Sequence, residues 1–312
     1  MNLRAGMPFP DFVLPAVNGV NALFYEQYCG KPALLVFSSS PGSFGDLEKV
    51  NSAHLNVIVF GKSCADPNGR VIIHAPERLS DRLRSNDPLS TTAVLLDSSL
   101  RVEQIINRPS PEYLADLATE VLPTNNVGRT VTSTAPVLIE DSIIEPGMAR
   151  ELISVHQSEN FQSGMDRGLG GEQQLKVDAR LKSRWDHPLT DQTLVRELNN
   201  ELTERLIPII TRTFHFRPSQ FEGYKIVAYR SSDNGRFELH RDNVAKAVRH
   251  RRLALSVNLN AEFEGGELIF PEYSTDRYRP GTGSAIVFSG SLLHGVNPVT
   301  AGVRYALITF LW

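Results

Sequence analysis

A polar stretch near the middle of the chain most constrains its fold, because it separates two regions with different hydrophobic patterns. From Pro123 to Pro136 it reads PTNNVGRTVTSTAP, with a proline at each end and no apolar periodicity. This composition is typical of a linker between domains. The 312 residues of the chain also correspond to about two domains of roughly 150 residues each. We therefore predict one domain at residues 1–122, a linker at residues 123–135 and a second domain at residues 136–312.

The first region alternates short apolar runs with longer mixed segments. Runs of strand length occur at residues 33–37, 57–60 and 92–96. The intervening residues 44–55 and 76–84 are candidates for helices. Alternation of strands with helices predicts an α/β sandwich for the amino-terminal domain.

The second region begins with helical patterns and then changes to strands. Apolar residues recur at helical spacing over residues 145–157 and 190–213, and Pro208 should kink or end the second helix. Runs of strand type follow at residues 224–230, 236–240, 252–260, 267–270, 284–288 and 304–311. Many short strands separated by Gly and Pro are typical of barrels and jelly rolls. We therefore predict a double-stranded β-helix, or jelly roll, with flanking helices.

Charge and hydropathy exclude several classes of protein. The formal net charge is −3 at pH 7 with both signs interspersed, so nothing favours binding to nucleic acid or to a membrane surface. The longest apolar runs are too short to span a bilayer, and residues 1–10 lack a signal-peptide core. We expect a cytoplasmic protein. Its two cysteines, Cys29 and Cys64, have no disulfide or zinc spacing and are expected to be small, buried, reduced thiols.

A metal-binding pattern lies within the predicted strands. His240 and Asp242 are separated by one residue, so an extended backbone places both side chains on the same face. His294, from a later strand, supplies a second imidazole, and two histidines with one carboxylate form the facial triad typical of non-heme iron(II) sites. The structural alternative is that both histidines are hydrogen-bonded and that Asp242 caps a turn. Their position at strand ends favours the metal site.

Several sequence blocks after residue 136 occur in the order and spacing of a known enzyme family. These blocks are FELHRD, LSVNLN, GGELIFPEY, PGTGSAIVFSGSLLHGVNPVT and GVRYALITFLW. The region resembles the catalytic domain of the prolyl 4-hydroxylase branch of the iron(II)- and 2-oxoglutarate-dependent dioxygenases. The resemblance implies that His240, Asp242 and His294 are the iron ligands. It also implies that Arg304, ten residues beyond His294, holds the far carboxylate of 2-oxoglutarate, since a guanidinium binds a carboxylate through two parallel hydrogen bonds.

Two further residues are candidates for contacts with the co-substrate. Tyr229 stands where the family commonly has a tyrosine that hydrogen-bonds to 2-oxoglutarate, although an ordinary strand residue would fit the pattern equally well. Asn258 is a second neutral candidate, at a position where some relatives have an aromatic hydroxyl. The resemblance also implies O2 as the oxidant, ascorbate as a supporting reductant, and succinate and CO2 as products.

Two positions favour one reaction among those that related enzymes perform. Halogenating relatives have a small residue in place of Asp242, so the aspartate favours hydroxylation. The AlkB-like demethylases carry a second arginine six residues after the first, where this chain has Phe310, which argues against base repair. The expected substrate is a prolyl residue of a protein or peptide, with a free amino acid or a natural-product intermediate as the alternative. A non-enzymatic protein that senses iron or 2-oxoglutarate and binds a partner is the remaining hypothesis.

The amino-terminal region carries a second resemblance. Its blocks GMPFPDFVLPAVNG, GKPALLVFSSSPGSF, NVIVFGKS and TTAVLLDSSLRV resemble the peroxiredoxin branch of the thioredoxin-like proteins. Active members have a reactive cysteine after the second block, where a helix amino terminus lowers the thiol pKa. This chain reads SSSPGSFGDLEKV there and has none. The resemblance therefore implies a degenerate domain that docks substrate or forms a homodimer, the alternative being a peroxidase that uses Cys64.

The sequence leaves the roles of three further features open. Residues 160–188 contain four glycines and form either a lid over a binding site or a disordered segment. Within it, Arg180 and Arg184 either reach the site or are solvated. The basic run at residues 249–252 is expected to be a solvated face rather than a site for an acidic partner. Strand parity predicts that Phe237 faces away from His240, unless a bulge intervenes.

Overall fold

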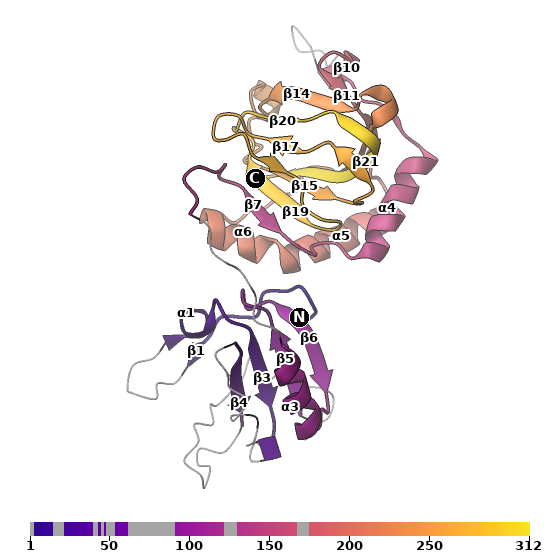
Figure 1. Ribbon diagram of the computed structural model, residues 1–312. Helices are drawn as coiled ribbons and strands as arrows, with labels where there is room; N and C mark the ends of the chain where they lie inside the picture. Colours follow the sequence, from indigo (N-terminus) through magenta and orange to yellow (C-terminus); the bar gives the residue numbers. More distant parts are fainter. Residues whose placement is uncertain are drawn as a thin grey trace. The chain divides into compact units, whose positions relative to one another are not determined.

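The computed structural model describes residues 3–14, 22–39, 43–44, 47, 54–61, 91–121, 130–166 and 175–312. The chain divides into two compact units, residues 1–129 and 130–312 (Figure 1). Within the described residues, no helix combines the length and the apolar character needed to cross a membrane.

The first unit contains a mixed four-stranded sheet. Its elements are β1 (Val13–Leu14), β2 (Ala22–Leu23), α1 (Phe24–Tyr28), β3 (Ala33–Phe37), β4 (Asn56–Phe60), β5 (Thr92–Leu96), β6 (Val102–Asn107) and α3 (Pro111–Glu120). The sheet has the order β4-β3-β5-β6, with β3 parallel to β4 and antiparallel to β5. The three strands predicted in this region are therefore confirmed. Of the predicted helices, residues 76–84 and most of residues 44–55 lie outside the described residues.

The central strand β3 is buried on both faces of this sheet. Ala33 and Leu35 belong to one apolar cluster, while Leu34 and Val36 belong to another that also contains Leu114 of α3. Alternating side chains of one strand thus serve two cores, as expected for a strand covered on both sides. Ser110 caps α3 by accepting a hydrogen bond from the backbone N–H of Tyr113 (3.2 Å).

The prediction of a buried thiol is wrong for Cys29, whose side chain is exposed. Cys29 follows the last residue of the short helix α1, so it lies outside both clusters on the faces of the sheet. Cys64 lies outside the described residues.

Three helices of the second unit pack on one face of its large sheet. They are α4 (Pro146–Ser158), α5 (Gln192–Arg205) and α6 (Ile207–Phe214), and both predicted helical segments are confirmed. The break between α5 and α6 falls at Leu206, two residues before Pro208. Proline lacks the N–H that would continue the first helix, and its ring would clash with the carbonyl four residues earlier. Leu152, Leu198 and Ile210 of these helices share one core cluster with the sheet.

Two antiparallel sheets form the rest of the second unit. The large sheet has the order β7-β19-β15-β21-β13-β12-β8, with β16 also paired to β21, and the small sheet has the order β11-β14-β20-β17-β18. Their strands are β7 (Leu138–Glu140), β8 (Phe161–Gln162), β11 (Lys182–Ser183), β12 (Trp185–Pro188), β13 (Lys225–Arg230), β14 (Arg236–His240), β15 (Leu253–Asn258), β16 (Phe263–Gly265), β17 (Leu268–Ile269), β18 (Arg277–Tyr278), β19 (Ala285–Ser289), β20 (His294–Val296) and β21 (Val299–Leu311). A separate hairpin joins β9 (Met165–Asp166) and β10 (Leu175–Lys176).

Side chains from both sheets meet in a single apolar cluster. Val227 and Ala306 come from the large sheet, and Leu268 and Val296 come from the small one. This packing gives a jelly-roll-like fold whose large sheet is covered by the three helices on its other face (Figure 1). All six strand segments predicted after residue 224 correspond to observed strands.

Strand β21 shows how the sequence sorts its side chains between the two faces. Ala306 and Phe310 contact the cluster between the sheets, whereas Leu307 and Leu311 contact the cluster beneath the helices. Since side chains alternate along a strand, Arg304 lies on the inner face with Ala306. The strand thus carries a charged residue into the interior of the jelly roll.

The end of the predicted linker is bonded to the second unit. The Ser133 hydroxyl donates to the carbonyl oxygen of Tyr273 (2.5 Å), and the backbone N–H of Ala135 donates to the Tyr278 hydroxyl (3.1 Å). Residues 122–129 lie outside the described residues. The exact domain boundaries therefore stay a prediction.

Candidate metal centre and its cavity

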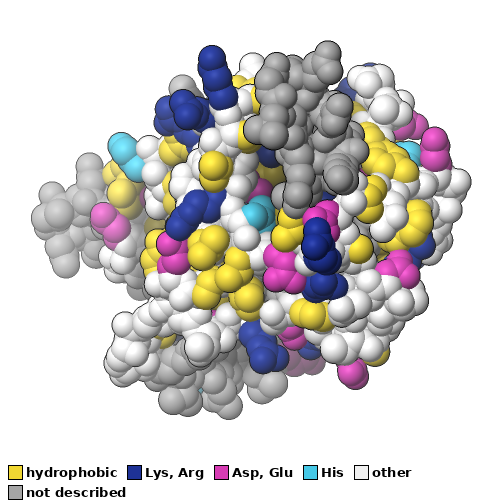
Figure 2. Space-filling model, turned by 90° about the horizontal axis from the view of Figure 1, so that it is seen from above, with side chains coloured by type: hydrophobic (Ala, Val, Ile, Leu, Met, Phe, Trp, Pro, Cys, Tyr) yellow, Lys and Arg dark blue, Asp and Glu magenta, His cyan; other side chains and the backbone are white. Residues whose placement is uncertain are grey.

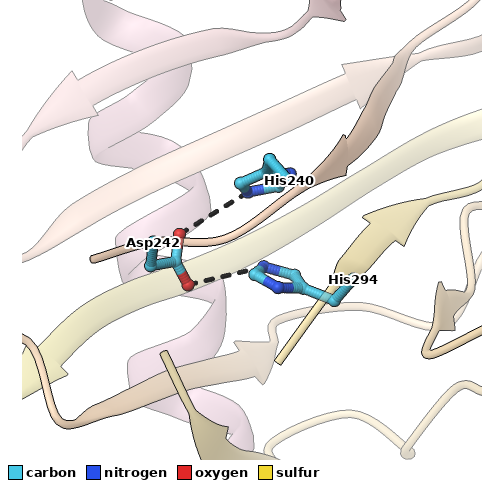
Figure 3. Close-up of side chains that lie close together, drawn as sticks. All are labelled: His240, Asp242 and His294. Atoms are coloured by element: carbon cyan, nitrogen blue, oxygen red, sulfur yellow. Dashed lines mark ion pairs between the residues drawn. The ribbon is translucent and has the colours of Figure 1, made fainter. Parts of the chain in front are cut away.

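The three predicted metal ligands lie together between two neighbouring strands. His240, the last residue of β14, is directly opposite His294, the first residue of β20. Asp242 follows β14 and is held by its backbone N–H, which donates to the carbonyl oxygen of Gly290 (2.9 Å). Its two carboxylate oxygens lie 3.5 Å from Nε2 of His240 and 3.4 Å from Nε2 of His294 (Figure 3). All three ligand atoms lie within 4.8 Å of one another, which is compatible with one shared ion.

Backbone carbonyl groups orient both imidazoles. Nδ1 of His240 donates to the carbonyl oxygen of Glu238 (2.8 Å), and Nδ1 of His294 donates to that of Leu292 (2.9 Å). A carbonyl oxygen only accepts, so each Nδ1 must carry the hydrogen and each Nε2 presents a lone pair to the site. Such contacts are the usual means by which proteins set the tautomer of a metal-binding histidine.

Burial and neighbouring groups shift the pKa values of His294 and Asp242 in the directions that metal binding requires. Burial lowers the pKa of His294, which keeps its imidazole neutral. Burial alone would raise the pKa of Asp242, but the interactions of its carboxylate with His240 and His294 outweigh this effect, so this pKa is lowered. Neutral imidazoles and an ionised carboxylate are the forms that bind metal. Two nitrogen donors and one oxygen donor fit iron(II) with open coordination positions.

A β-bulge places an aromatic ring against His240. The pairing of β14 with β20 shifts register between Phe237 and His240. The Phe237 ring stacks on the His240 imidazole with a centroid separation of 3.6 Å. The prediction from strand parity is therefore wrong for Phe237, because the bulge turns the ring toward the ligand. On the other side, the Phe288 ring lies edge-on to His294 at 4.7 Å, so aromatic side chains enclose both imidazoles.

The three ligands open into a cavity of about 670 Å³ inside the jelly roll. Tyr229, Arg304 and Phe310 line it together with the metal ligands. The volume falls within the range of pockets that bind small organic ligands. Figure 2 shows a histidine among hydrophobic and charged side chains on the face seen from above.

Arg304 is a buried cation in the wall of this cavity. Only 3% of the residue is exposed, and burial lowers the pKa of its guanidinium. The side chain donates from Nε and Nη2 to Oδ1 of Asn258 (3.1 and 2.9 Å), and its register partner on β13 is Tyr229. Within the described part of the chain, no carboxylate forms an ion pair with it. A buried charge without a counterion is costly, so an anion in the cavity would stabilise the guanidinium of Arg304.

Asn258 supports Arg304 rather than lining the cavity. Its Oδ1 accepts from the guanidinium, and its Nδ2 donates to the carbonyl oxygen of Pro280 (2.7 Å). Both ends of the amide are therefore engaged within the protein, and Asn258 is absent from the cavity lining. A direct contact with a co-substrate stays a prediction, whereas the position of Asn258 suits the orientation of Arg304.

Segment 160–188 contributes side chains that the sequence analysis did not assign to the site. Its strand β11 pairs with β14, and β12 pairs with β13, so its described residues complete both sheets. Arg184 is buried and lines the cavity, where its guanidinium is paired with Asp186 (2.7 Å). Arg180, by contrast, is exposed and paired with Asp178. Of the two arginines, only Arg184 reaches the cavity.

The basic run at residues 249–252 also divides between solvent and the cavity. Arg249, His250 and Arg252 are exposed, as expected for a solvated face. Arg251 instead lines the cavity, where it is paired with Glu222 and stacks over the Phe310 ring at 3.9 Å. The expectation of a solvated face is therefore wrong for Arg251, because its guanidinium is held at the cavity wall by Glu222 and the Phe310 ring.

Comparison with known proteins agrees with this site. Residues 224–312 match the 2OG-Fe(II) oxygenase superfamily. The PKHD-type hydroxylase PiuC of Pseudomonas aeruginosa is 28% identical over 160 residues, which cover 47% of this chain and 65% of that relative. A PKHD-type hydroxylase of Delftia acidovorans is 48% identical over 52 residues, which cover 16% of this chain and 22% of the relative. The chain thus spans 65% of the first relative's length.

A solved structure, a prolyl-4-hydroxylase from Pseudomonas putida, aligns with a TM-score of 0.44 at 15% identity, over 57% of this chain and 92% of that protein. The matched segment, residues 224–312, contains the candidate metal ligands and Arg304. The segment of this chain at residues 224–312 is therefore similar to the 2OG-Fe(II) oxygenase superfamily.

Proposed function

We propose that this protein is an iron(II)- and 2-oxoglutarate-dependent dioxygenase that hydroxylates an aliphatic carbon. One observation carries the proposal: a group of two histidines and one aspartate shares a cavity with a buried arginine that has no carboxylate partner among the described residues. The first feature suits iron(II), and the second suits the free carboxylate of a dicarboxylic acid.

In this proposal, each residue has a separate role. His240, Asp242 and His294 would hold the iron, and Arg304 would bind the far carboxylate of 2-oxoglutarate, with Tyr229 beside it in the wall. Bound iron supplies the reduction of O2, coupled to conversion of the 2-oxo acid to succinate and CO2 and to insertion of one oxygen atom into a C–H bond. The protein contributes orientation, because the cavity fixes the target carbon and its aromatic walls exclude water.

Hydroxylation is the outcome that the ligand set favours. The Asp242 carboxylate lies near both imidazoles, so it would hold the metal where a halogenase would need room for a halide. Phe310 packs beneath Arg251 instead of providing a second arginine on β21. Both features support a hydroxylase over a halogenase or a base-repair enzyme.

We infer that the substrate is a prolyl residue of a protein or peptide. The names of the PKHD-type relatives support hydroxylation, and the resemblance to prolyl 4-hydroxylases supports proline as the target. A free amino acid or a natural-product intermediate is the alternative. The two substrate classes are distinguished by whether the oxidised product found in a cell extract is a macromolecule.

We infer that the first unit is a thioredoxin-like domain without peroxidase activity. Its sheet order β4-β3-β5-β6, with one parallel pair and helix α3 against one face, supports this assignment. The sequence between β3 and β4 contains no cysteine. The role that remains for this unit is to dock the substrate or to form a homodimer. Light scattering of the full chain tests whether the protein is a dimer.

The experiment is to incubate the full chain with iron(II), ascorbate, 2-oxoglutarate and a cell extract, then to measure succinate and search by mass spectrometry for products with one added oxygen atom. The Asp242→Ala variant is the control. Oxygenated products that form only with the unaltered protein would support the proposal. Tight binding of iron and 2-oxoglutarate without any turnover would instead favour a sensor. Peroxide consumption that survives His240→Ala and disappears in Cys64→Ser would favour a peroxidase.

A further inference from the structure

Two lysines line the cavity without a carboxylate partner among the described residues. Lys182, on β11, is 6% exposed, and its Nζ donates to the carbonyl oxygen of Gly164 (2.6 Å). Lys225, at the start of β13, is half-buried and lines the same cavity. The neighbouring arginines differ in this respect, since Arg184 is paired with Asp186 and Arg251 with Glu222. The lysines therefore give this wall an excess of positive charge.

Lys182 lies close to the candidate metal centre. Its register partner across the small sheet is Phe237, and its Nζ lies 5.2 Å from the centre of the Phe237 ring. The same ring stacks on the imidazole of His240, at 3.6 Å between centroids. Lys182 and the candidate metal ligand His240 thus contact the same aromatic ring, and both line the cavity.

Lys225 lies on the same inner row of β13 as Tyr229, four residues before it. Tyr229 is paired in register with Arg304, and Lys225 is paired with Ile308. Lys225 on β13 and Arg304 on β21 therefore lie four register positions apart along this pair of strands. Arg304 is sufficient for the far carboxylate of the co-substrate, so the two lysines exceed what 2-oxoglutarate requires.

Burial and neighbouring cations destabilise the protonated forms of both lysines. Burial, together with the charge of Arg184, lowers the pKa of Lys182 to about 7. Burial also lowers the pKa of Lys225. The charge of Lys225 also contributes to the lowered pKa of Lys182. A buried ammonium near another cation is destabilised unless an anion binds to it.

We propose that Lys182 and Lys225 bind an anionic group, a carboxylate or a phosphate, of the molecule that is oxidised. This inference rests on the proposed function, because it assigns the substrate class of the same cavity. Lysine ammonium groups bind such anions as compact point charges with several donors. Lys182 retains donors beyond the one used by Gly164. A substrate with a negative charge a short distance from its target carbon would thereby be oriented against the iron.

The experiment uses the full chain with Mn(II) in place of iron and with saturating 2-oxoglutarate, so that Arg304 is already occupied. Acetate and inorganic phosphate are the anionic probes, and acetamide is the neutral counterpart of acetate. Paramagnetic relaxation of the probe nuclei by Mn(II) reports binding near the metal. We expect saturable relaxation for acetate, phosphate or both, which also identifies the favoured anion, and none for acetamide.

Lys182→Met and Lys225→Met should each weaken anion binding about tenfold, because each removes a charge-assisted hydrogen bond. Lys182→Arg keeps the charge and should retain binding. Lys246→Met is the matched control. Lys246 is exposed, although neighbouring residues in the sequence border the cavity, and this variant should bind the anions as the unaltered protein does.

Binding of Mn(II) and 2-oxoglutarate is measured on the same samples by calorimetry, which separates the two proposals. If the unaltered protein fails to bind 2-oxoglutarate, the proposed function itself is in error. If it binds 2-oxoglutarate but neither anion, or if acetamide behaves like acetate, only the present inference is overturned. Unchanged anion binding in both Met variants, or loss of 2-oxoglutarate binding in Lys182→Met alone, would also overturn it.

Discussion

His240 lies directly opposite His294 in the register of β14 and β20, and the carboxylate of Asp242 contacts both imidazoles. The geometry of the candidate metal centre therefore depends on strand register, because a change of register by one residue would send one imidazole to the other face. The backbone carbonyl groups of Glu238 and Leu292 then fix the two rings. The ligands are therefore preorganised by strand pairing.

Replacement of a ligand should abolish tight metal binding without unfolding the domain. We expect Asp242→Ala and His294→Ala each to weaken Mn(II) or iron(II) binding by about 100-fold or more, since even residues that merely orient ligands typically account for 10- to 100-fold. Calorimetric titration with Mn(II) measures the effect. Glu238→Ala is the matched control, because His240 bonds to the backbone of Glu238 and not to its side chain. Equal metal affinity in all these proteins would refute the assignment.

Arg304→Ala should keep its metal and lose its affinity for 2-oxoglutarate. Loss of two charge-assisted hydrogen bonds at about 1.5–3 kcal/mol each predicts a dissociation constant raised about 100-fold or more. The measurement is titration of the Mn(II)-loaded protein with 2-oxoglutarate. Normal 2-oxoglutarate binding in Arg304→Ala would assign the co-substrate carboxylate to another cation of the cavity.

Asn258 offers a sharper test of the same contact. Asn258→Ala removes the acceptor that orients the guanidinium, so we expect 2-oxoglutarate binding to weaken about tenfold. Asn258→Asp should weaken it further, because the new carboxylate would form a buried ion pair with Arg304 and compete with the co-substrate. A residue with only a packing role would give similar results for the two variants, and that result would count against the proposed orientation of Arg304.

Sequence patterns that reflect local backbone geometry predicted the structure well. Alternation along residues 304–311 places Arg304 on the inner face, and Pro208 marks the break between α5 and α6. His240 and Asp242 are separated by one residue, and this spacing likewise brings their side chains together. These features depend on local geometry, which is present in the sequence itself.

Features set by tertiary pairing were not predictable. Phe237 contacts His240 only because a bulge shifts the pairing of β14 with β20. Lys182 is on a strand of two residues, and Arg184 lies between that strand and one of four residues, so both strands are too short to show periodicity. The burial of Arg251 follows from its pairing with Glu222, 29 residues earlier in the chain. For the cavity wall, the sequence offered a single signal. The glycine-rich segment at residues 160–188 contains charged residues together with a Trp and a His.

The apolar face of α5 should dominate the stability of the second unit. Leu202 is fully buried in the cluster between the helices and the large sheet. We expect Leu202→Ala to lower the free energy of unfolding by about 3 kcal/mol, within the usual range for a leucine truncated in a core. Urea denaturation followed by circular dichroism measures the change. Val244→Ala is the control, because Val244 is 68% exposed, and its effect should be within about 0.5 kcal/mol. Comparable losses in both variants would contradict the described packing.

His156 should make the second unit less stable in mild acid. It is buried in α4, its Nε2 lies 3.1 Å from the carbonyl oxygen of Trp185, and its Nδ1 has no hydrogen-bond partner. Burial lowers the pKa of its imidazole, so the folded protein holds the neutral form while the unfolded chain takes up a proton near pH 6.5. The unfolded state therefore binds more protons, and stability should fall as the pH decreases below about 6.5.

The contribution of His156 to this loss approaches about 1.4 kcal/mol per pH unit at its steepest. The measurement is urea denaturation between pH 7.5 and pH 5 for the unaltered protein and for His156→Gln, in which no imidazole titrates at this position. Other groups affect both proteins alike, so the difference between the two curves isolates His156. We expect the two free energies to run parallel above about pH 7 and the unaltered protein to lose stability faster below about pH 6.5. Parallel curves over the whole range would show that His156 takes up its proton equally well in the folded state.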